Sequence, residues 1–455
     1  MPTAALGAEI RATLRLAAPL ALAFATLQLL TLTDTAVAGH LGASALAAVG
    51  LGHSMYYIAS TFPAGVMLAL DPLVAQAIGA GRPEETRRHL ASARRLALWL
   101  TLPATLAALA LTAAALALGD LGADTRAQTW GYLLARLPSI WPYLVGIAQR
   151  SVLQSWGRLA PFVHATLIAN LVNVPASVGL GFGDRALTAI GLPAIGLGDG
   201  LGVVGIGLAS TLVAFVQVAI TARAVRRLPV PAEPDAAPPP LRPQWRLGWP
   251  VGLQYLAEVG IFGGATAVMG VFGETPLAAG QITFQITTLG FCACLGIGNA
   301  AAVRVGLAVG AGDTPSARRA GLIAAGLGLA IMGASATALL VFAPAIAAAF
   351  TPVPAVQSAA TVLLRIAAAW QLFDAVQAVM AGALRGAGDT RAAMIIGVVG
   401  YWIIGVPVAL GLAFGAALAL PGLYWGLVVG LAFSAVVLAA RFLAVSARPI
   451  AAVAR

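Results

Sequence analysis

Long apolar stretches separated by short polar segments follow one another along the whole chain. Residues 96–118, 321–342 and 422–440 are examples, and each is long enough to cross a hydrocarbon core of about 30 Å as a helix. The alternating ten-residue strands of a membrane barrel are missing from the pattern. We therefore predict an all-α membrane protein of about twelve transmembrane helices, near residues 14–37, 46–69, 96–118, 130–149, 162–182, 200–222, 248–271, 277–302, 321–343, 357–383, 393–414 and 422–441.

The composition supports a bilayer environment. Of the 455 residues, 60% are hydrophobic and 9% are charged, whereas a soluble domain carries about 25% charged residues. All 26 basic residues are arginines. All but Arg126, Arg136, Arg185 and Arg365 cluster before the first span and after every even-numbered one, as at 82–95, 223–246 and 385–391. Cytoplasmic loops carry such an excess. We predict a multi-pass protein of the bacterial inner membrane with both termini in the cytoplasm.

The net charge of +10 follows this loop pattern, so it does not indicate a nucleic-acid partner. The expected partners are the lipid bilayer and small molecules, and we expect the protein to act as a monomer.

The two halves of the chain repeat each other. At an offset of 231 residues, the following pairs coincide: Pro19 and Pro250, Gly42 and Gly273, Gly81 and Gly312, Arg88 and Arg319, Gly157 and Gly388. Six spans per half give both halves the same orientation. We therefore predict two six-helix lobes related by a pseudo-two-fold axis along the membrane normal, with a cavity between them.

A proline-rich stretch divides these repeats almost in the middle of the chain. Such a run cannot continue a helix and is typical of a semi-rigid extended tether. We predict an N-terminal lobe over residues 1–228, a cytoplasmic linker over 229–245 and a C-terminal lobe over 246–455.

Three acidic residues, Asp34, Glu258 and Asp374, lie well inside apolar stretches. Charged groups there are costly and usually functional. Each has polar company at helical spacing, which places these side chains on one face: Gln28 and Thr31, then Gln254, then Gln371 and Gln377. A desolvated carboxyl can carry a proton, and two carboxylates with amide oxygens also suit Na⁺. The structural alternative is a protonated carboxyl that only bridges helices.

Other polar stripes are candidates for lining a cavity. Asn170, Asn173 and Ser177 share one face of the fifth span, where Pro175 frees a backbone carbonyl. Ser210 in the sixth span and Gln281 and Gln285 in the eighth are further candidates. The alternative for all of them is hydrogen bonding between helices.

For three other charged residues at or inside spans, we favour a structural role over a functional one. Asp71 either begins an Asp-Pro break or reaches towards water, and Arg136 and Arg365 either snorkel to an interface or pair with a carboxylate.

Enzyme signatures are missing from the sequence. There is no lysine for a phosphate-binding loop, and the four histidines are scattered. Cys292 and Cys294 are two positions apart on a helix and point away from each other, so we expect no disulfide between them. We predict no enzymatic activity and no cofactor beyond a coupling ion.

Several of these residues stand in motifs of a known family. Asp34 lies in LTDTAVAGHLG at 32–42, Glu258 in QYLAEVGIFGG at 254–264, and Asp374 in FDAVQAVMAGALRGAGDT at 373–390. The chain therefore resembles the multidrug and toxic compound extrusion (MATE) transporters, and the last segment is similar to the NorM-type branch.

The resemblance implies export of amphipathic or cationic compounds in exchange for inward Na⁺ or H⁺, by alternating access. It implies that Asp34 is the acidic residue of the N-terminal lobe, and that Glu258 and Asp374 form the cation-coupling site, which would also be the Na⁺ site in a sodium-coupled protein. Ser177 and Gly280 depart from the family pattern, and Ser177 weakens a cation site in the N-terminal lobe.

Three other functions remain as alternatives. A flippase or exporter of a lipid-linked or amphipathic metabolite would favour an arginine-rich groove. A membrane-embedded transferase would need a catalytic histidine or an aspartate-rich interfacial loop. A channel would not need tandem lobes with carboxylates near the midplane.

Overall fold

The computed structural model describes residues 3–453 except 190, 192, 195, 197 and 231–238, and it is all-helical over these residues. Predicted linker residues 231–238 lie outside the described part. The helices are α1 (Thr3–Leu41), α2 (Ala43–Met67), α3 (Leu70–Gly79), α4 (Glu85–Leu118), α5 (Ala123–Arg136), α6 (Ile140–Ser155), α7 (Ala160–Phe182), α8 (Asp184–Ala189), α9 (Val203–Arg226), α10 (Leu241–Val271), α11 (Glu274–Gly310), α12 (Thr314–Phe350), α13 (Pro354–Gly386), α14 (Thr390–Val398), α15 (Val406–Leu410) and α16 (Ala419–Val445).

Eleven helical segments among the described residues are long and apolar enough to cross a membrane. The remaining predicted span, 130–149, falls on two shorter helices. A 3₁₀ turn at Leu137–Ser139 separates α5 from α6. Pro138 in that turn cannot donate a backbone hydrogen bond, which explains why the span is not one continuous helix. The membrane-protein class and the helical spans are thus confirmed.

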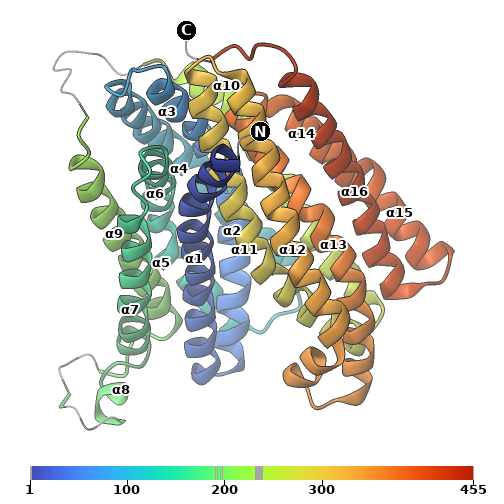
Figure 1. Cartoon of the computed structure of the whole chain (residues 1–455). Coiled ribbons are helices and arrows are strands. Elements are labelled where there is room, and N and C mark those ends of the chain that lie inside the picture. The colour runs from blue at the N-terminus through green and yellow to red at the C-terminus, as the bar shows by residue number, and fades with distance from the viewer. Residues whose placement is uncertain are drawn as a thin grey trace. The chain divides into compact units, whose positions relative to one another are not determined.

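The chain forms two compact units. Unit 1 contains Met1–Leu22, Asp71–Glu85 and Trp245–Arg455, and unit 2 contains Ala23–Leu70 and Thr86–Gln244. Figure 1 shows α12 beside α13, two of the most extensively packed helices of unit 1, and α7 beside α9 in unit 2. The division into two lobes at the proline-rich stretch stays a prediction.

The core of unit 2 lies between α2, α4, α5, α6 and α9. Met67, Leu100, Leu133 and Leu144 are buried in it. In unit 1, Trp370 is the centre of an aromatic group, with ring centroids 5.6 Å from Phe262, 6.0 Å from Phe284 and 6.0 Å from Tyr424. These rings lock α10, α11, α13 and α16 together, because aromatic side chains bury large apolar areas.

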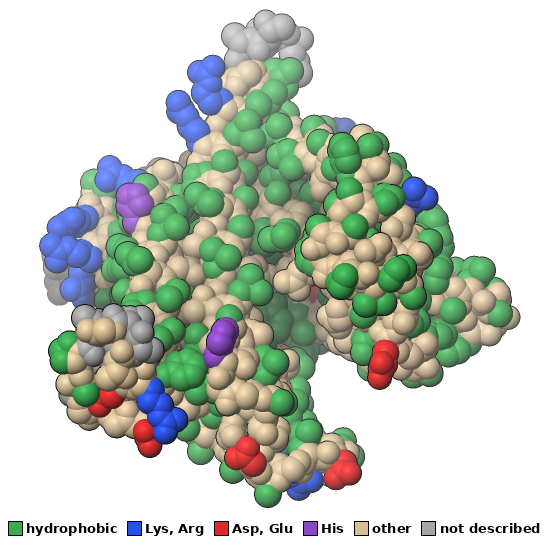
Figure 2. Space-filling view, turned by 90° about the horizontal axis from the view of Figure 1, so that it is seen from below, with side chains coloured by type: hydrophobic (Ala, Val, Ile, Leu, Met, Phe, Trp, Pro, Cys, Tyr) green, Lys and Arg blue, Asp and Glu red, His purple; other side chains and the backbone are tan. Residues whose placement is uncertain are grey.

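The outward side chains of the helices are apolar as well. Figure 2 shows hydrophobic side chains spread over the face in view and only a few charged ones. On α4, Leu98 is 64% exposed and Trp99 73% exposed. Apolar surface of this extent is unsuited to water and suited to acyl chains.

The internal repeat is visible in the backbone. Gly42 and Gly273 both have positive φ (123° and 99°) immediately before a long helix. The pairs at 81 and 312 (74° and 73°) and at 157 and 388 (66° and 84°) also share a left-handed conformation. L side chains rarely adopt it, so the repeated glycines have a common conformational cause.

The eleventh span is irregular. Two π-helical segments, Val399–Gly405 and Gly411–Gly415, flank the short helix α15. Here the backbone packs closely on α16: a Cβ at Gly426 would lie 2.1 Å from the Ala409 Cα, and one at Gly430 2.6 Å from the Gly400 carbonyl oxygen. Only glycine permits this approach at both positions.

Candidate functional site

The first acidic cluster surrounds Asp34 in unit 2. The carboxylate is 3% exposed. It accepts hydrogen bonds at 3.3 Å from both Asn173 Nδ2 and Ser177 Oγ on α7, and a further one from Ser210 Oγ on α9. The structure therefore brings together Asp34, Asn173, Ser177 and Ser210 from three helices, a meeting that the polar stripes of the single helices did not predict. Three hydrogen-bond donors from the protein thus take the place of water around the buried Asp34 carboxylate.

A cation lies near the same cluster. Arg136 interacts electrostatically with Asp34, and its guanidinium lies 4.9 Å from the centroid of the Tyr56 ring. This arrangement is a cation–π contact. No carboxylate of the described residues lies within ion-pair distance of Arg136, so pairing with a carboxylate is not the explanation for this residue.

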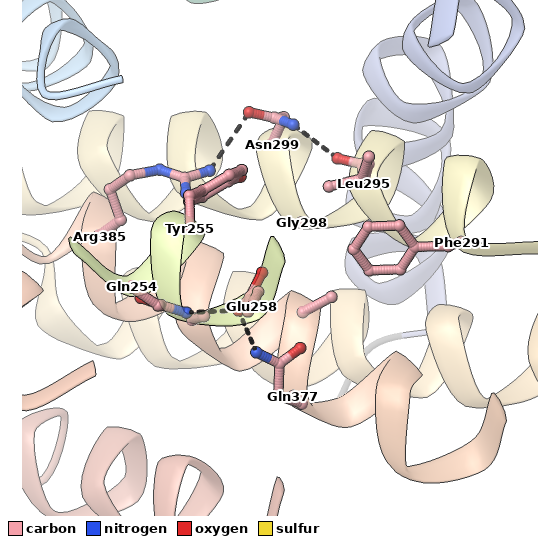
Figure 3. A pocket seen from close by; sticks show the side chains of 11 residues that line it. Gln254, Tyr255, Glu258, Phe291, Leu295, Gly298, Asn299, Gln377 and Arg385 are labelled. Atoms are coloured by element: carbon pink, nitrogen blue, oxygen red, sulfur yellow. Dashed lines mark hydrogen bonds between the residues drawn. The ribbon is translucent and has the colours of Figure 1, made fainter. Parts of the chain in front are cut away.

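The second acidic cluster lies in unit 1, around Glu258 on α10. Its Oε1 accepts hydrogen bonds from Gln254 Nε2 at 3.2 Å and from Gln377 Nε2 of α13 at 3.0 Å. Figure 3 shows both amides pointing at the carboxylate. The carboxylate lines a small pocket of about 20 Å³, together with Phe291 and Arg385. The predicted pairing of Glu258 with polar neighbours is therefore present, with Gln377 as its cross-helix partner.

Asp374 lies on α13 near this cluster, without lining the pocket. It is 8% exposed and interacts electrostatically with Glu258. One turn away, Gln371 is 1% exposed, and neither its amide nitrogen nor its carbonyl oxygen has a hydrogen-bond partner within the described structure. An unmatched buried amide oxygen beside a carboxylate is suited to a cation.

A third cluster, which the sequence patterns did not indicate, closes one side of the Glu258 pocket. Arg385 Nε lies 3.4 Å from Asp71 Oδ2, with side-chain exposures of 7% and 0%, and Arg385 Nη2 donates to Asn299 Oδ1 at 3.2 Å. The expected snorkelling of Asp71 is wrong, because its side chain is buried against Arg385. The expected helix break is present, between the end of α2 at Met67 and the start of α3 at Leu70.

Arg385 was expected at the edge of a loop, and it lies there, but its side chain is buried. It belongs to the last turn of α13 and is 6% exposed. Arg150, also expected near a loop, is 6% exposed and lies over the Phe24 ring at 5.2 Å. Loop-edge arginines were identified by position alone, and position does not reveal whether a neighbouring helix covers them.

The remaining polar candidates lie outside both carboxylate clusters. Asn170 Nδ2 donates to the carbonyl oxygens of Thr26 and Thr166, so it joins helices. Thr31 is partly buried and its carbonyl accepts from Thr35. Gln28, Gln281, Gln285 and Arg365 are exposed. Cys292 and Cys294 are buried free thiols. In the described part of the chain, no three His, Cys, Asp or Glu side chains are grouped closely enough to hold a metal ion.

Comparison with known sequences gives consistent matches over nearly the whole chain. A family model described as MatE matches residues 19–178 and 250–410. The starts of these two segments are separated by the same 231-residue offset that relates the repeats. The "Probable multidrug resistance protein NorM" of Bradyrhizobium diazoefficiens is 36% identical over 97% of this chain and 95% of its own. The protein of the same description from Pseudomonas putida is 36% identical, covering 94% and 93% of the two chains.

A solved structure has the same fold. The crystal structure of the eukaryotic MATE transporter AtDTX14 matches with a TM-score of 0.84 over 96% of both chains, at 18% sequence identity. At this identity the match concerns the fold and not the chemistry of individual side chains.

Proposed function

Because the chain belongs to the MatE family, we propose that it is a secondary antiporter that exports small amphipathic or cationic compounds in exchange for inward Na⁺ or H⁺. Its relatives carry the description of multidrug resistance proteins, and the chain supplies buried carboxylates for cationic partners. The observation that carries the proposal is the acidic set of unit 1, in which Glu258 faces a pocket and interacts with the nearby carboxylate of Asp374.

The acidic set of unit 1 is the better candidate for the coupling site. Asp34 already accepts three hydrogen bonds and has Arg136 in its neighbourhood, so a transported cation would compete with groups that are already in place. Two nearby carboxylates repel each other when both are ionised. A proton or Na⁺ bound between Glu258 and Asp374 relieves that repulsion. We assign coupling to this pair and a role in substrate binding or in unit 2 structure to Asp34.

The free energy of coupling is sufficient for useful export. One coupling charge that moves inward in exchange for a neutral compound yields about 2.3 kcal/mol per 100 mV. This supports roughly a 50-fold substrate gradient, since about 1.4 kcal/mol corresponds to a factor of ten. A 1:1 exchange for a monovalent cationic compound moves no net charge and is driven by the ion concentration gradient alone. Ion binding neutralises buried charge and thereby shifts the balance between outward-open and inward-open states. In the proposed cycle, drug and ion displace each other from the acidic sites.

The decisive experiment is efflux of a fluorescent cationic dye, such as ethidium, from vesicles on which Na⁺ and pH gradients are imposed separately. Glu258→Gln and Asp374→Asn should abolish gradient-driven efflux, because the neutral side chains cannot exchange a cation. Asp34→Asn should retain ion dependence and change dye affinity.

Ion-driven efflux at the wild-type rate in both unit 1 variants would contradict the assignment. Thr266→Ala is a matched control, because the Thr266 hydroxyl only bonds the Phe262 carbonyl one turn earlier on α10.

A further inference from the structure

The ion pair between Asp71 and Arg385 joins segments from the two sequence repeats inside unit 1. Asp71 lies in the first turn of α3, which precedes the proline-rich stretch, and Arg385 lies in the last turn of α13, which follows it. Both side chains are buried. Removing one partner of a buried ion pair leaves an uncompensated charge. The contact between Asp71 and Arg385 is therefore structurally important and not an incidental surface contact.

The surrounding backbone keeps α3 close to α11 and α13. Gln76 Nε2 donates to the Gly386 carbonyl at 2.9 Å. A Cβ at Gly310 would lie 2.1 Å from the Gln76 carbonyl oxygen, and one at Gly79 would lie 2.0 Å from the Leu307 carbonyl oxygen. Asp71 is therefore positioned against Arg385 by helix packing, and movement of α3 would remove it.

Arg385 also belongs to the Glu258 pocket. Both side chains line this pocket, and the guanidinium acts electrostatically on Glu258. In the structure, Asp71 and Asn299 hold the guanidinium, while Gln254 and Gln377 hold the carboxylate. Figure 3 shows Arg385 directed at Asn299 and away from Glu258. The pocket thus contains the cationic guanidinium of Arg385, which the Glu258 carboxylate does not bind in this state.

We propose that Arg385 is a positioning residue that competes with the transported cation for Glu258, and that Asp71 withholds it until α3 separates from α13. This inference rests on the proposed antiport function and concerns the same site. When Asp71 moves away, the Arg385 guanidinium loses this partner, and Glu258 is the carboxylate that lines the same pocket. Arg385 then neutralises Glu258 and displaces the bound Na⁺ or H⁺, which promotes ion release at the end of the transport stroke.

The proposal predicts opposite effects for the two partners of the ion pair. Arg385→Gln removes the competitor, so the ion concentration for half-maximal ethidium efflux should fall about tenfold, while the maximal rate falls because release is slow. Asp71→Asn frees the competitor, so that concentration should rise about tenfold. Coupling free energies between sites commonly correspond to factors of about 5 to 150. Arg385→Lys keeps the charge and should restore the ion dependence towards wild type.

The measurement uses the full-length protein in proteoliposomes, with the ion gradient that drives the wild type. Each single variant leaves one buried charge unpaired, whereas the double variant Asp71→Asn with Arg385→Gln leaves none. The double variant therefore keeps the test valid if the single variants fold poorly, and it should resemble Arg385→Gln in ion dependence. Arg304→Gln is the matched control. Arg304 forms a two-point contact with Glu9, another link to the first repeat, but it does not line the pocket, so half-maximal ion concentration should not change.

Shifts in the same direction for both single variants, or no shift in the double variant, would overturn the competition. Absence of ion-driven efflux in the wild type would instead refute the antiport function itself, so the two failures are distinguishable.

Discussion

Individual carboxyl groups in this protein have contrasting surroundings. Asp34 and Glu258 receive side-chain donors inside the helical bundles. Asp313 is exposed and caps α12 by accepting a hydrogen bond from the Ser316 backbone N–H at 2.9 Å. This bond stabilises the charged form and holds the pKa of Asp313 below its usual range.

Asp313→Ala should loosen the first turn of α12. Losing such a cap costs about 1 kcal/mol, so amide hydrogen exchange at residues 316–318 should accelerate about fivefold. Because the folded-state pKa is depressed, the charged cap's extra stabilisation is present above the unfolded pKa and is lost as the pH falls through the folded value.

Asp313→Asn provides the control for the charge. Asparagine caps nearly as well without ionising, so exchange should stay slow and its acid sensitivity should disappear. Equal exchange rates in wild type and the alanine variant would show that the cap contributes nothing.

Sequence spacing identified residue pairs that share a helix, and it failed for pairs that do not. Gln254 and Glu258 are one turn apart, so helical period alone places them together. Asp71 and Arg385 are on different repeats, and their contact depends on the packing of α3 against α13. The only sequence signal was an acidic residue at the end of an apolar run, and snorkelling explained it equally well.

At the scale of elements, the spans followed from hydropathy but their irregularities did not. Pro138 offered a local signal for the break between α5 and α6. The π-helical segments around α15 have no comparable signal, because they accompany close contact with α16. Such bulges frequently mark functional positions.

Gly426→Ala tests that contact. The new Cβ would lie 2.1 Å from the Ala409 Cα and 2.2 Å from its nitrogen, so backbone must move, at a cost of about 1–3 kcal/mol. The expected result is a lower melting temperature of the purified protein in detergent.

Gly411→Ala is the matched control in the same span. A Cβ there meets nothing within 4 Å, and alanine is favoured over glycine in helices by up to about 1 kcal/mol. This variant should be as stable as the wild type or more so. Destabilisation of both variants alike would argue against close packing as the cause.

For the whole molecule, the arginine distribution predicts a specific membrane topology. Asp120 follows α4 and Arg448 follows α16, and both side chains are exposed. The native thiols Cys292 and Cys294 are buried, which keeps background labelling low.

Cysteine labelling in intact cells tests the topology. A membrane-impermeant maleimide should label Asp120→Cys, which is predicted to face outward, and should leave Arg448→Cys unlabelled until the membrane is opened. The reverse pattern would place the C-terminus outside the cell.

The interleaving of the two units has a consequence for biogenesis. Residues 1–22 and 71–85 belong to unit 1, yet the ribosome finishes α11 and α13 long after these segments have entered the membrane. Until then Asp71 lacks Arg385, and Glu9 lacks Arg304. These two acidic groups of the first half therefore meet their arginine partners only when synthesis of the chain is nearly complete.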